Sequence, residues 1–181
     1  MNYTPQDLTT AAPADHPDAR FDVANRLFLR LYQASNLMHK TGPRAVSRHN
    51  ATTQQWAVMG ALSRPAARER GMTVKELIGF LMVSRQNLAG VLARLEDLGL
   101  VERVRGADGD GRLRHVRLTP EGERAWRDML GDIRGYYAAA LDGFTTEECV
   151  LLFRLLDRLR DSLDGLPAPP LGGPASRGAS G

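Results

Sequence analysis

The chain has 181 residues, of which 43% are apolar and 25% are charged, a balance typical of a globular domain with a sizeable core. No apolar run approaches the ~20 residues that a membrane span needs, and the N-terminus lacks the basic and apolar segments of a secretory signal. The only cysteine, Cys149, excludes an intrachain disulfide and a cysteine-based zinc site. We therefore expect a reduced, cytoplasmic protein with no membrane partner.

Charge is distributed unevenly along the chain, although the net charge is only +3. Residues 1–118 carry 17 Lys and Arg against 11 Asp and Glu, whereas residues 119–181 carry 7 against 10. A basic first part joined to an acidic last part indicates an anionic partner at one end of the molecule. Nucleic acid is the leading candidate.

Both ends of the chain have low-complexity composition. Residues 1–18 are rich in Pro and Thr without periodicity, and residues 164–181 are rich in Pro, Gly, Ala and Ser. We expect disordered extensions there, on either side of one folded unit over 19–163. The first predicted helix runs from about Arg20 to Lys40 and is stopped by Gly42-Pro43.

Three further helices carry local start and stop signals. The second starts at Thr52, where Thr-Thr-Gln-Gln offers a capping box, and runs to Pro65. The third starts at Thr73, with Glu76 as its reciprocal cap, and ends near Met82. The fourth runs from Ser84 to Gly99, a glycine suited to the position after a helix end.

Two short strand-like runs follow, Leu100–Arg105 and Leu113–Leu118, joined by the glycine-rich turn GADGDG. A fifth helix starts at Thr119-Pro120, and a last one, opened by Thr145, extends to Leu163. The sequence therefore predicts a mostly α fold with a small β-hairpin (α+β). We place a winged helix-turn-helix lobe over 52–118, flanked by dimerisation helices and adjoining segments over 20–50 and 120–163.

The predicted helix over 84–98 has one unusually bare face. Its apolar residues gather on one side, and Ala89, Gly90 and Ala93 occupy the opposite side. A mid-helix glycine costs roughly 1 kcal/mol relative to alanine, so its presence needs a reason. A DNA major groove, ~12 Å wide, admits a helix closely, and small side chains let the helix backbone approach base edges. The alternative is that these small residues pack against a neighbouring helix.

Polar and basic side chains flank this face and continue onto the hairpin, where residues 103–117 contain five arginines. The candidate DNA-binding residues are Ser84, Arg85, Gln86, Asn87, Ala89, Gly90, Arg94, Arg103, Arg105, Asp110, Arg112 and Arg114. A competing hypothesis makes the winged helix a protein-interaction module whose arginines meet an acidic partner. Steep salt dependence and preference for one duplex would favour DNA.

These residues also resemble a known family. The segment TVKELIGFLMVSRQNLAGVLARLEDLGLVERV, the Asp110-Gly111-Arg112 turn and VRLTPEG are similar to the winged helix of MarR-type bacterial transcription regulators. The resemblance covers roughly residues 20–163 and is strongest over 73–125. It implies an obligate homodimer with intertwined first and last helices. It also implies that Asp110 orients Arg112 toward the minor groove; Gly111 departs from the second basic residue often found there.

The predicted last helix carries more apolar residues than one stripe needs: Val150, Leu151, Leu152, Phe153, Leu155, Leu156, Leu159 and Leu163. Some of this surface could cover the first helix of the same chain, but a dimer seam explains the excess better. Two recognition helices would then read half-sites about 34–36 Å apart in a near-palindromic operator.

A second cluster suggests an effector site. The basic residues His39, Lys40, Arg44, Arg48 and His49 lie between two predicted helices, and Trp56, Tyr136 and Tyr137 could line an adjoining cavity. Such a site suits a small anionic aromatic effector, either an aromatic carboxylate or its coenzyme A thioester. The alternative is a solvated loop beside core aromatics.

No motif indicates an enzyme or a cofactor. The sequence lacks a phosphate-binding glycine loop, a GxSxG elbow and a metal-spaced cluster, and Cys149 is interpreted as a core thiol beside acidic neighbours. We expect a sequence-specific transcription regulator, a repressor released by its effector, with a ligand-responsive activator as the alternative.

Overall fold

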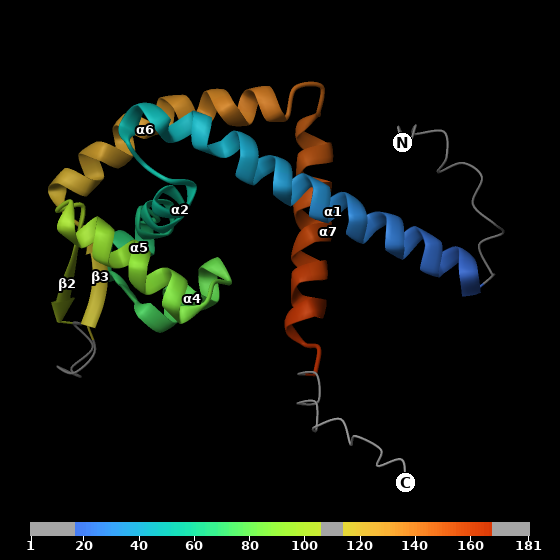
Figure 1. The fold of residues 1–181 in the computed structure, drawn as a ribbon, viewed down its shortest axis with the longest axis horizontal. Coiled ribbons are helices and arrows are strands. Elements are labelled where there is room, and N and C mark those ends of the chain that lie inside the picture. Colours follow the sequence, from blue (N-terminus) through green and yellow to red (C-terminus); the bar gives the residue numbers. More distant parts are fainter. Residues whose placement is uncertain (1–16, 106–113, 168–181) are drawn as a thin grey trace, which may run out of the picture. The chain divides into compact units, whose positions relative to one another are not determined.

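The computed structural model describes residues 17–105 and 114–167 of the chain (Figure 1). Two compact units divide after Ala139. In chain order the elements are α1 (Pro17–Val46), the 3₁₀ helix η2 (Ser47–His49), α2 (Thr53–Leu62), α3 (Pro65–Arg70), β1 (Met72–Thr73), α4 (Val74–Leu81), α5 (Arg85–Asp97), β2 (Val101–Arg105), β3 (Arg114–Leu118), α6 (Pro120–Ala140) and α7 (Thr146–Asp164). The predicted fold class, mostly helical with a small sheet, is confirmed.

The helix starts follow from local capping. At α2, the Thr52 backbone N–H donates to Gln55 Oε1 at 2.8 Å, and the Gln55 N–H donates to Thr52 Oγ1 at 3.2 Å. Thr73 and Thr145 make the same reciprocal arrangement at α4 and α7. Ser84 Oγ accepts from the Asn87 N–H at the start of α5. These caps satisfy backbone donors that a helix start leaves unpaired.

The predicted end of the first helix is wrong. α1 continues through Gly42 and Pro43 to Val46. Pro43 lies in the last turn, where it removes one backbone hydrogen bond without ending the helix. The last turn is held by packing, because Val46 is 1% exposed and a Cβ at Gly42 would lie only 2.9 Å from Thr53 Cγ2 of α2. Tertiary contact therefore outweighs the local stop signal.

Three short elements, η2, α3 and β1, were not predicted. Pro65, taken as the end of a helix, instead occupies the first turn of α3, a position where its missing N–H costs nothing. β1 has two residues and pairs antiparallel with β3, Met72 opposite Val116. The sheet order is β1-β3-β2, so the predicted hairpin is two strands of a three-stranded sheet.

The core of the first unit joins the helices to this sheet. Its most enclosed side chains are Met59, Leu62, Leu77, Leu88, Leu92, Leu95, Val116 and Met129. His115 of β3 is 1% exposed, and its Cβ lies close to Gly71. In Figure 1 the C-terminal end of α1 lies next to α6, where Thr41 Oγ1 and the Tyr136 hydroxyl are hydrogen-bonded at 2.8 Å.

The second unit is described by α7, and none of the residues in that helix is buried. Among the described helices, none combines the length and hydropathy that a membrane crossing requires. The extensions were predicted over 1–18 and 164–181, but α1 already begins at Pro17 and α7 ends at Asp164. Residues 1–16 and 168–181, and the turn over 106–113, lie outside the described residues.

Candidate nucleic-acid interface

α5 has two distinct faces. Leu88, Leu92 and Leu95 are at most 1% exposed and hold the helix against the core. On the other face Ala89, Gly90 and Ala93 are exposed. A Cβ at Gly90 would find no atom within 4 Å. Packing within the described part of the chain therefore does not explain why this face carries small residues.

The bare face forms one wall of an open groove of about 580 Å³ between α5 and the start of α2. Its lining residues are Thr52, Gln54, Gln55, Ser84, Gln86, Asn87, Gly90, Val91 and Arg94. Four of the predicted DNA-binding residues of α5, with their cap Ser84, thus come together. Gln54 was missed as a lining residue, because the capping signal at Thr52 locates the start of a helix but not its position beside α5.

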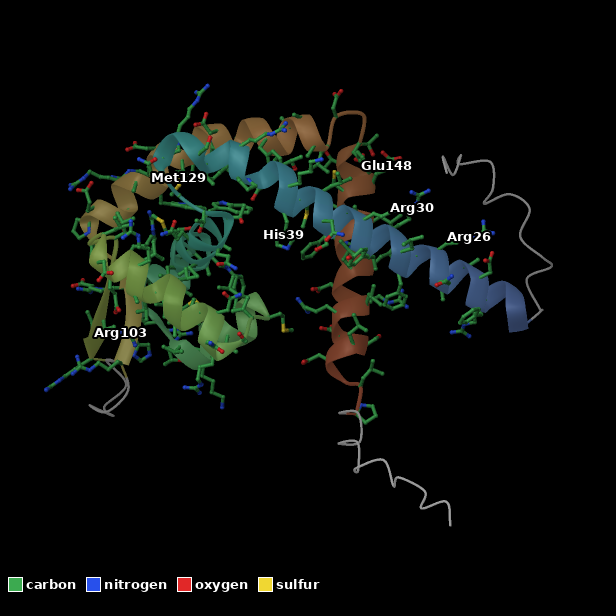
Figure 2. All side chains as sticks on the ribbon, viewed as in Figure 1. Arg26, Arg30, His39, Arg103, Met129 and Glu148 are labelled. Carbon is green, nitrogen blue, oxygen red and sulfur yellow. The ribbon has the colours of Figure 1, made fainter. Side chains whose placement is uncertain are left out.

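The arginines of this lobe differ in their partners. Arg85 and Arg94 are exposed and make no ion pair with any residue that the structure describes. Arg103 of β2, labelled in Figure 2, donates from Nε to Glu96 Oε1 at 2.6 Å, and this hydrogen bond ties the strand to α5. Arg117 donates to Glu102 Oε1 at 2.8 Å. Arg103 was predicted as a DNA contact, and the structure gives it an intrachain carboxylate.

The remaining hairpin candidates lie at the end of the ladder. Arg105 of β2 stands opposite Arg114 of β3 in the strand register, and both are exposed. The predicted wing pair, Asp110 and Arg112, falls outside the described residues. The structure thus leaves basic side chains on both the recognition helix and the adjoining strands.

Of the five predicted basic effector residues, the structure brings Arg48 and His49 against α6. His39, Lys40 and Arg44 are exposed on the last turns of α1, not in a loop between helices. Figure 2 labels His39 on this helix. His49 Nε2 lies 3.1 Å from Asp132 Oδ2 of α6, and Arg48 Nη1 lies 3.8 Å from Asp132 Oδ1. One carboxylate on α6 therefore faces two of the five basic groups.

The aromatic members of this cluster lie on α2 and α6. The rings of Trp56 and Tyr137 have centroids 6.2 Å apart, and Tyr136 and Tyr137 are separated by the same distance. Partial burial, with a smaller contribution from Tyr136, raises the pKa of the Tyr137 phenol. Its hydroxyl therefore keeps its proton at neutral pH and is available as a hydrogen-bond donor.

Long apolar faces remain exposed on α1 and α7. Their large apolar residues with at least 40% exposure include Phe21, Val23, Leu27, Phe28, Leu29, Tyr32, Leu37, Met38, Val150, Leu151, Leu152, Phe153, Leu155, Leu156 and Leu163. Cys149, interpreted from the sequence as a core thiol, is only partly buried. Among the described residues no group of three or more potential metal ligands comes together.

Known proteins resemble this chain in sequence and in fold. The sequence model of the MarR family matches residues 49–113. The transcriptional activatory protein BadR of Rhodopseudomonas palustris is 44% identical over 153 residues, covering 82% of this chain and 86% of BadR. The homoprotocatechuate degradative operon repressor of Escherichia coli is 32% identical over 112 residues, covering 62% of this chain and 72% of the repressor. The solved structure of NadR in complex with 4-hydroxyphenylacetate has a TM-score of 0.62 at 27% identity. The match covers 78% of this chain and 99% of the NadR chain.

The similarity to BadR extends well beyond the winged lobe, at an identity that leaves no doubt of common ancestry. Both curated relatives are named as regulators of gene expression, not as enzymes. The order of elements agrees with this assignment: the helix-turn-helix of α4 and α5 is preceded by β1 and followed by β2 and β3, and the three strands form one sheet. The chain belongs to the MarR family of transcription regulators.

Proposed function

We propose that this protein binds a near-palindromic operator as a homodimer, with α5 of each subunit in the major groove. The observation that carries this proposal is the bare face of α5, where Gly90 opens into free space between Gln86, Asn87 and Arg94. A helix backbone can approach base edges closely along such a face. Gln and Asn match the edge of adenine, and Arg matches guanine or a phosphate.

The exposed apolar faces of α1 and α7 support the homodimer. A second copy would cover side chains such as Phe28, Leu152 and Leu156, each more than 40% exposed in one chain. Two-fold symmetry would place the two recognition helices one helical turn of DNA apart, about 34–36 Å. Arg112 at the wing, oriented by Asp110, stays a proposal that rests on the resemblance.

The proposed effector is an aromatic carboxylate or its coenzyme A thioester, bound at the junction of α1, α2 and α6. Three observations support this choice: Lys40 and Arg44 are exposed on the last turns of α1, Thr41 of α1 is hydrogen-bonded to Tyr136 of α6, and the ring of Tyr137 lies beside that of Trp56. Two comparisons point the same way: one relative is named for a homoprotocatechuate degradative operon, and NadR holds 4-hydroxyphenylacetate.

The two curated relatives are named for opposite directions of regulation, BadR as an activator and the Escherichia coli protein as a repressor. We propose that operator position decides the direction here. Binding over a promoter blocks the polymerase, which gives repression that the effector relieves. A reporter gene with the operator placed either over or upstream of the promoter tests this directly.

Gly90→Glu tests the DNA-binding proposal. A long anionic side chain on the groove-facing side would meet phosphates and base edges, so we expect specific operator binding to be lost while the helix content is unchanged. Fluorescence anisotropy with operator and random duplexes measures binding, and circular dichroism measures folding. Gly131→Glu is the matched control, because Gly131 is also exposed in a helix, α6, with nothing within 4 Å of a Cβ.

A folded Gly90→Glu protein that keeps operator affinity would contradict the groove-facing role of α5. The competing function, a protein-interaction module, predicts no difference between operator and random duplexes. Steep loss of operator affinity with salt, together with strong preference over random duplex, would exclude it.

A further inference from the structure

The end of the wing ladder holds an arrangement that the fold alone does not explain. In the β2–β3 register, Glu102 stands opposite Arg117 and Arg105 stands opposite Arg114. The first is a pair of opposite charges, with Arg117 Nε 2.8 Å from Glu102 Oε1. The second places two positive charges directly across the ladder. Side chains opposite each other in an antiparallel pair lie close together, so like charges there are destabilising.

No carboxylate in the described part of the chain compensates the second pair. Glu96 is engaged with Arg103 and Glu102 with Arg117. Arg105 and Arg114 are exposed, and neither makes an ion pair with any described residue. The register therefore places two positively charged residues opposite each other, and no described carboxylate forms an ion pair with either of them.

The strand alternation shows which side of the sheet the pair occupies. Arg103 and Arg105 are two residues apart in β2 and therefore share a face, and the register places Arg114 on that face too. Arg103 reaches Glu96 of α5, so this is the face on the side of the recognition helix. A DNA strand bound along α5 would pass the same side of the wing.

We propose that Arg105 and Arg114 together form a binding site for one phosphate of the operator backbone. Each guanidinium presents several N–H donors in a plane that matches phosphate oxygens. One phosphodiester shared by the two supplies the negative charge that the ladder lacks, so repulsion in the free protein becomes attraction in the complex. This inference rests on the proposed function and names a contact within it.

We expect Arg105→Gln and Arg114→Gln each to change two properties, the stability of the free protein and its affinity for the operator. In the free protein, either substitution removes the repulsion and lowers the unfolding equilibrium constant by up to about fivefold at low salt, an effect that 1 M salt abolishes. In operator binding, either substitution lowers affinity by about tenfold or more. The double variant loses less than the product of the two single effects, because both arginines hold the same phosphate.

Urea unfolding at low and high salt measures the first expectation, and fluorescence anisotropy with the operator measures the second. A set of operator duplexes, each with one neutral methylphosphonate, locates the contact: one substitution should weaken the wild type and leave the double variant unaffected. Arg117→Gln is the control. It removes the same charge from the same hairpin but breaks the pair with Glu102, so it should lower stability and keep the methylphosphonate profile.

Single variants that destabilise the free protein would show that the chain compensates the pair itself and would overturn the proposal. If the losses of operator affinity multiply in the double variant, the two arginines do not share one phosphate, and the proposal is wrong. If the wild type binds no operator, both the proposed function and this inference are wrong. If Gly90→Glu abolishes binding while both Arg→Gln variants bind like the wild type, the proposed function stands and only this inference fails.

Discussion

At Gly122 the first turn of α6 lies directly against the corner that follows the recognition helix. A Cβ there would overlap the carbonyl oxygen of Leu100 far inside van der Waals contact. Thr119 strengthens the same corner, since its hydroxyl donates to the Gly99 carbonyl at 2.6 Å and accepts from the Gly122 N–H at 3.0 Å. The corner after α5 is thus tied to the start of α6 by the hydrogen bonds of Thr119 and by a close backbone approach that only glycine at position 122 permits.

Gly122→Ala should therefore destabilise the protein by roughly 1–3 kcal/mol, although alanine favours a helix, because the added methyl group forces two backbones apart. Urea unfolding measures the change. Gly135→Ala in the same helix is the control, since nothing lies within 4 Å of a Cβ there, and helix propensity should make it neutral or stabilising. Equal stabilities for the two variants would show that α6 moves freely against the corner.

The start of α4 combines a cap with an ion pair. The Thr73 backbone N–H donates to Glu76 Oε2 at 2.7 Å, and Arg70 Nη1 lies 2.8 Å from Glu76 Oε1. Partial burial alone would raise the pKa of the Glu76 carboxyl, but the hydrogen bonds from Thr73 and Arg70 outweigh it. They hold that pKa below its ordinary value of 4.5. The ionised carboxylate therefore stabilises the folded state.

Glu76→Gln should reduce the acid sensitivity of the fold. Because the folded-state pKa lies below the unfolded one, Glu76 contributes its stability above about pH 4.5 and loses it as the pH falls through the folded-state value. Urea unfolding at neutral and acidic pH measures the difference. The wild type should lose more stability on acidification than the variant. Glu69→Gln, on the exposed surface of α3, should leave that dependence unchanged.

The elements that could be predicted are those whose signals are local. Thr52, Thr73 and Ser84 mark helix starts within four residues of sequence, and the structure places caps at all three. β1 has only two residues and forms because β3 lies beside it, so the sequence contains no alternating pattern that predicts it. The end of α1 likewise depends on contact between Gly42 and α2, which chain order does not reveal.

The candidate site divides in the same way. Spacing alone placed Gly90 on the outer face of α5, because a helix fixes which residues share a side. The partners of the arginines follow from strand register and from the distance between α5 and β2. Five arginines over 103–117 therefore looked equivalent in sequence, whereas Arg103 and Arg117 have carboxylate partners, and Arg105 faces Arg114.

At the scale of the whole molecule, α7 carries the apolar surface expected to join two copies. Leu152, Leu156 and Leu163 share one side of the helix and are each at least 41% exposed. Leu156→Glu should convert the dimer to a monomer, because two carboxylates would have to be buried in the apolar seam. Sedimentation velocity measures the size. Arg154→Glu adds the same group on the opposite side of α7 and should leave the dimer intact.

Loss of the dimer should also lower the affinity for the operator. Two linked recognition helices bind two half-sites with an effective local concentration that a monomer lacks, so Leu156→Glu should weaken binding to the full operator by a factor of 100 or so. Binding to a single half-site should change little. A monomeric variant that retains full operator affinity would mean that one lobe reads the site alone.

The effector prediction joins both scales, because the junction of α1, α2 and α6 connects the winged lobe to the helices expected to pair. A ligand that binds both states of the dimer equally shifts nothing, so release requires preference for a dimer whose recognition helices are wrongly spaced. A tenfold loss of operator affinity needs only about 1.4 kcal/mol of coupling. Calorimetry with benzoates, cinnamates and their coenzyme A thioesters should find binding, and gel shifts with the same compounds should show operator release.

Arg44→Ala/Arg48→Ala protein should lose that binding, because both guanidinium groups are available to a carboxylate at this junction. Arg48 is held only loosely by Asp132, at 3.8 Å and with a side chain that is 83% exposed, so an incoming anion can displace that partner at little cost. Arg20→Ala/Arg30→Ala removes the same charge from exposed positions earlier in α1 and should bind ligand like the wild type. Equal binding by both double variants would show that the basic cluster is only a solvated surface and that the effector site lies elsewhere.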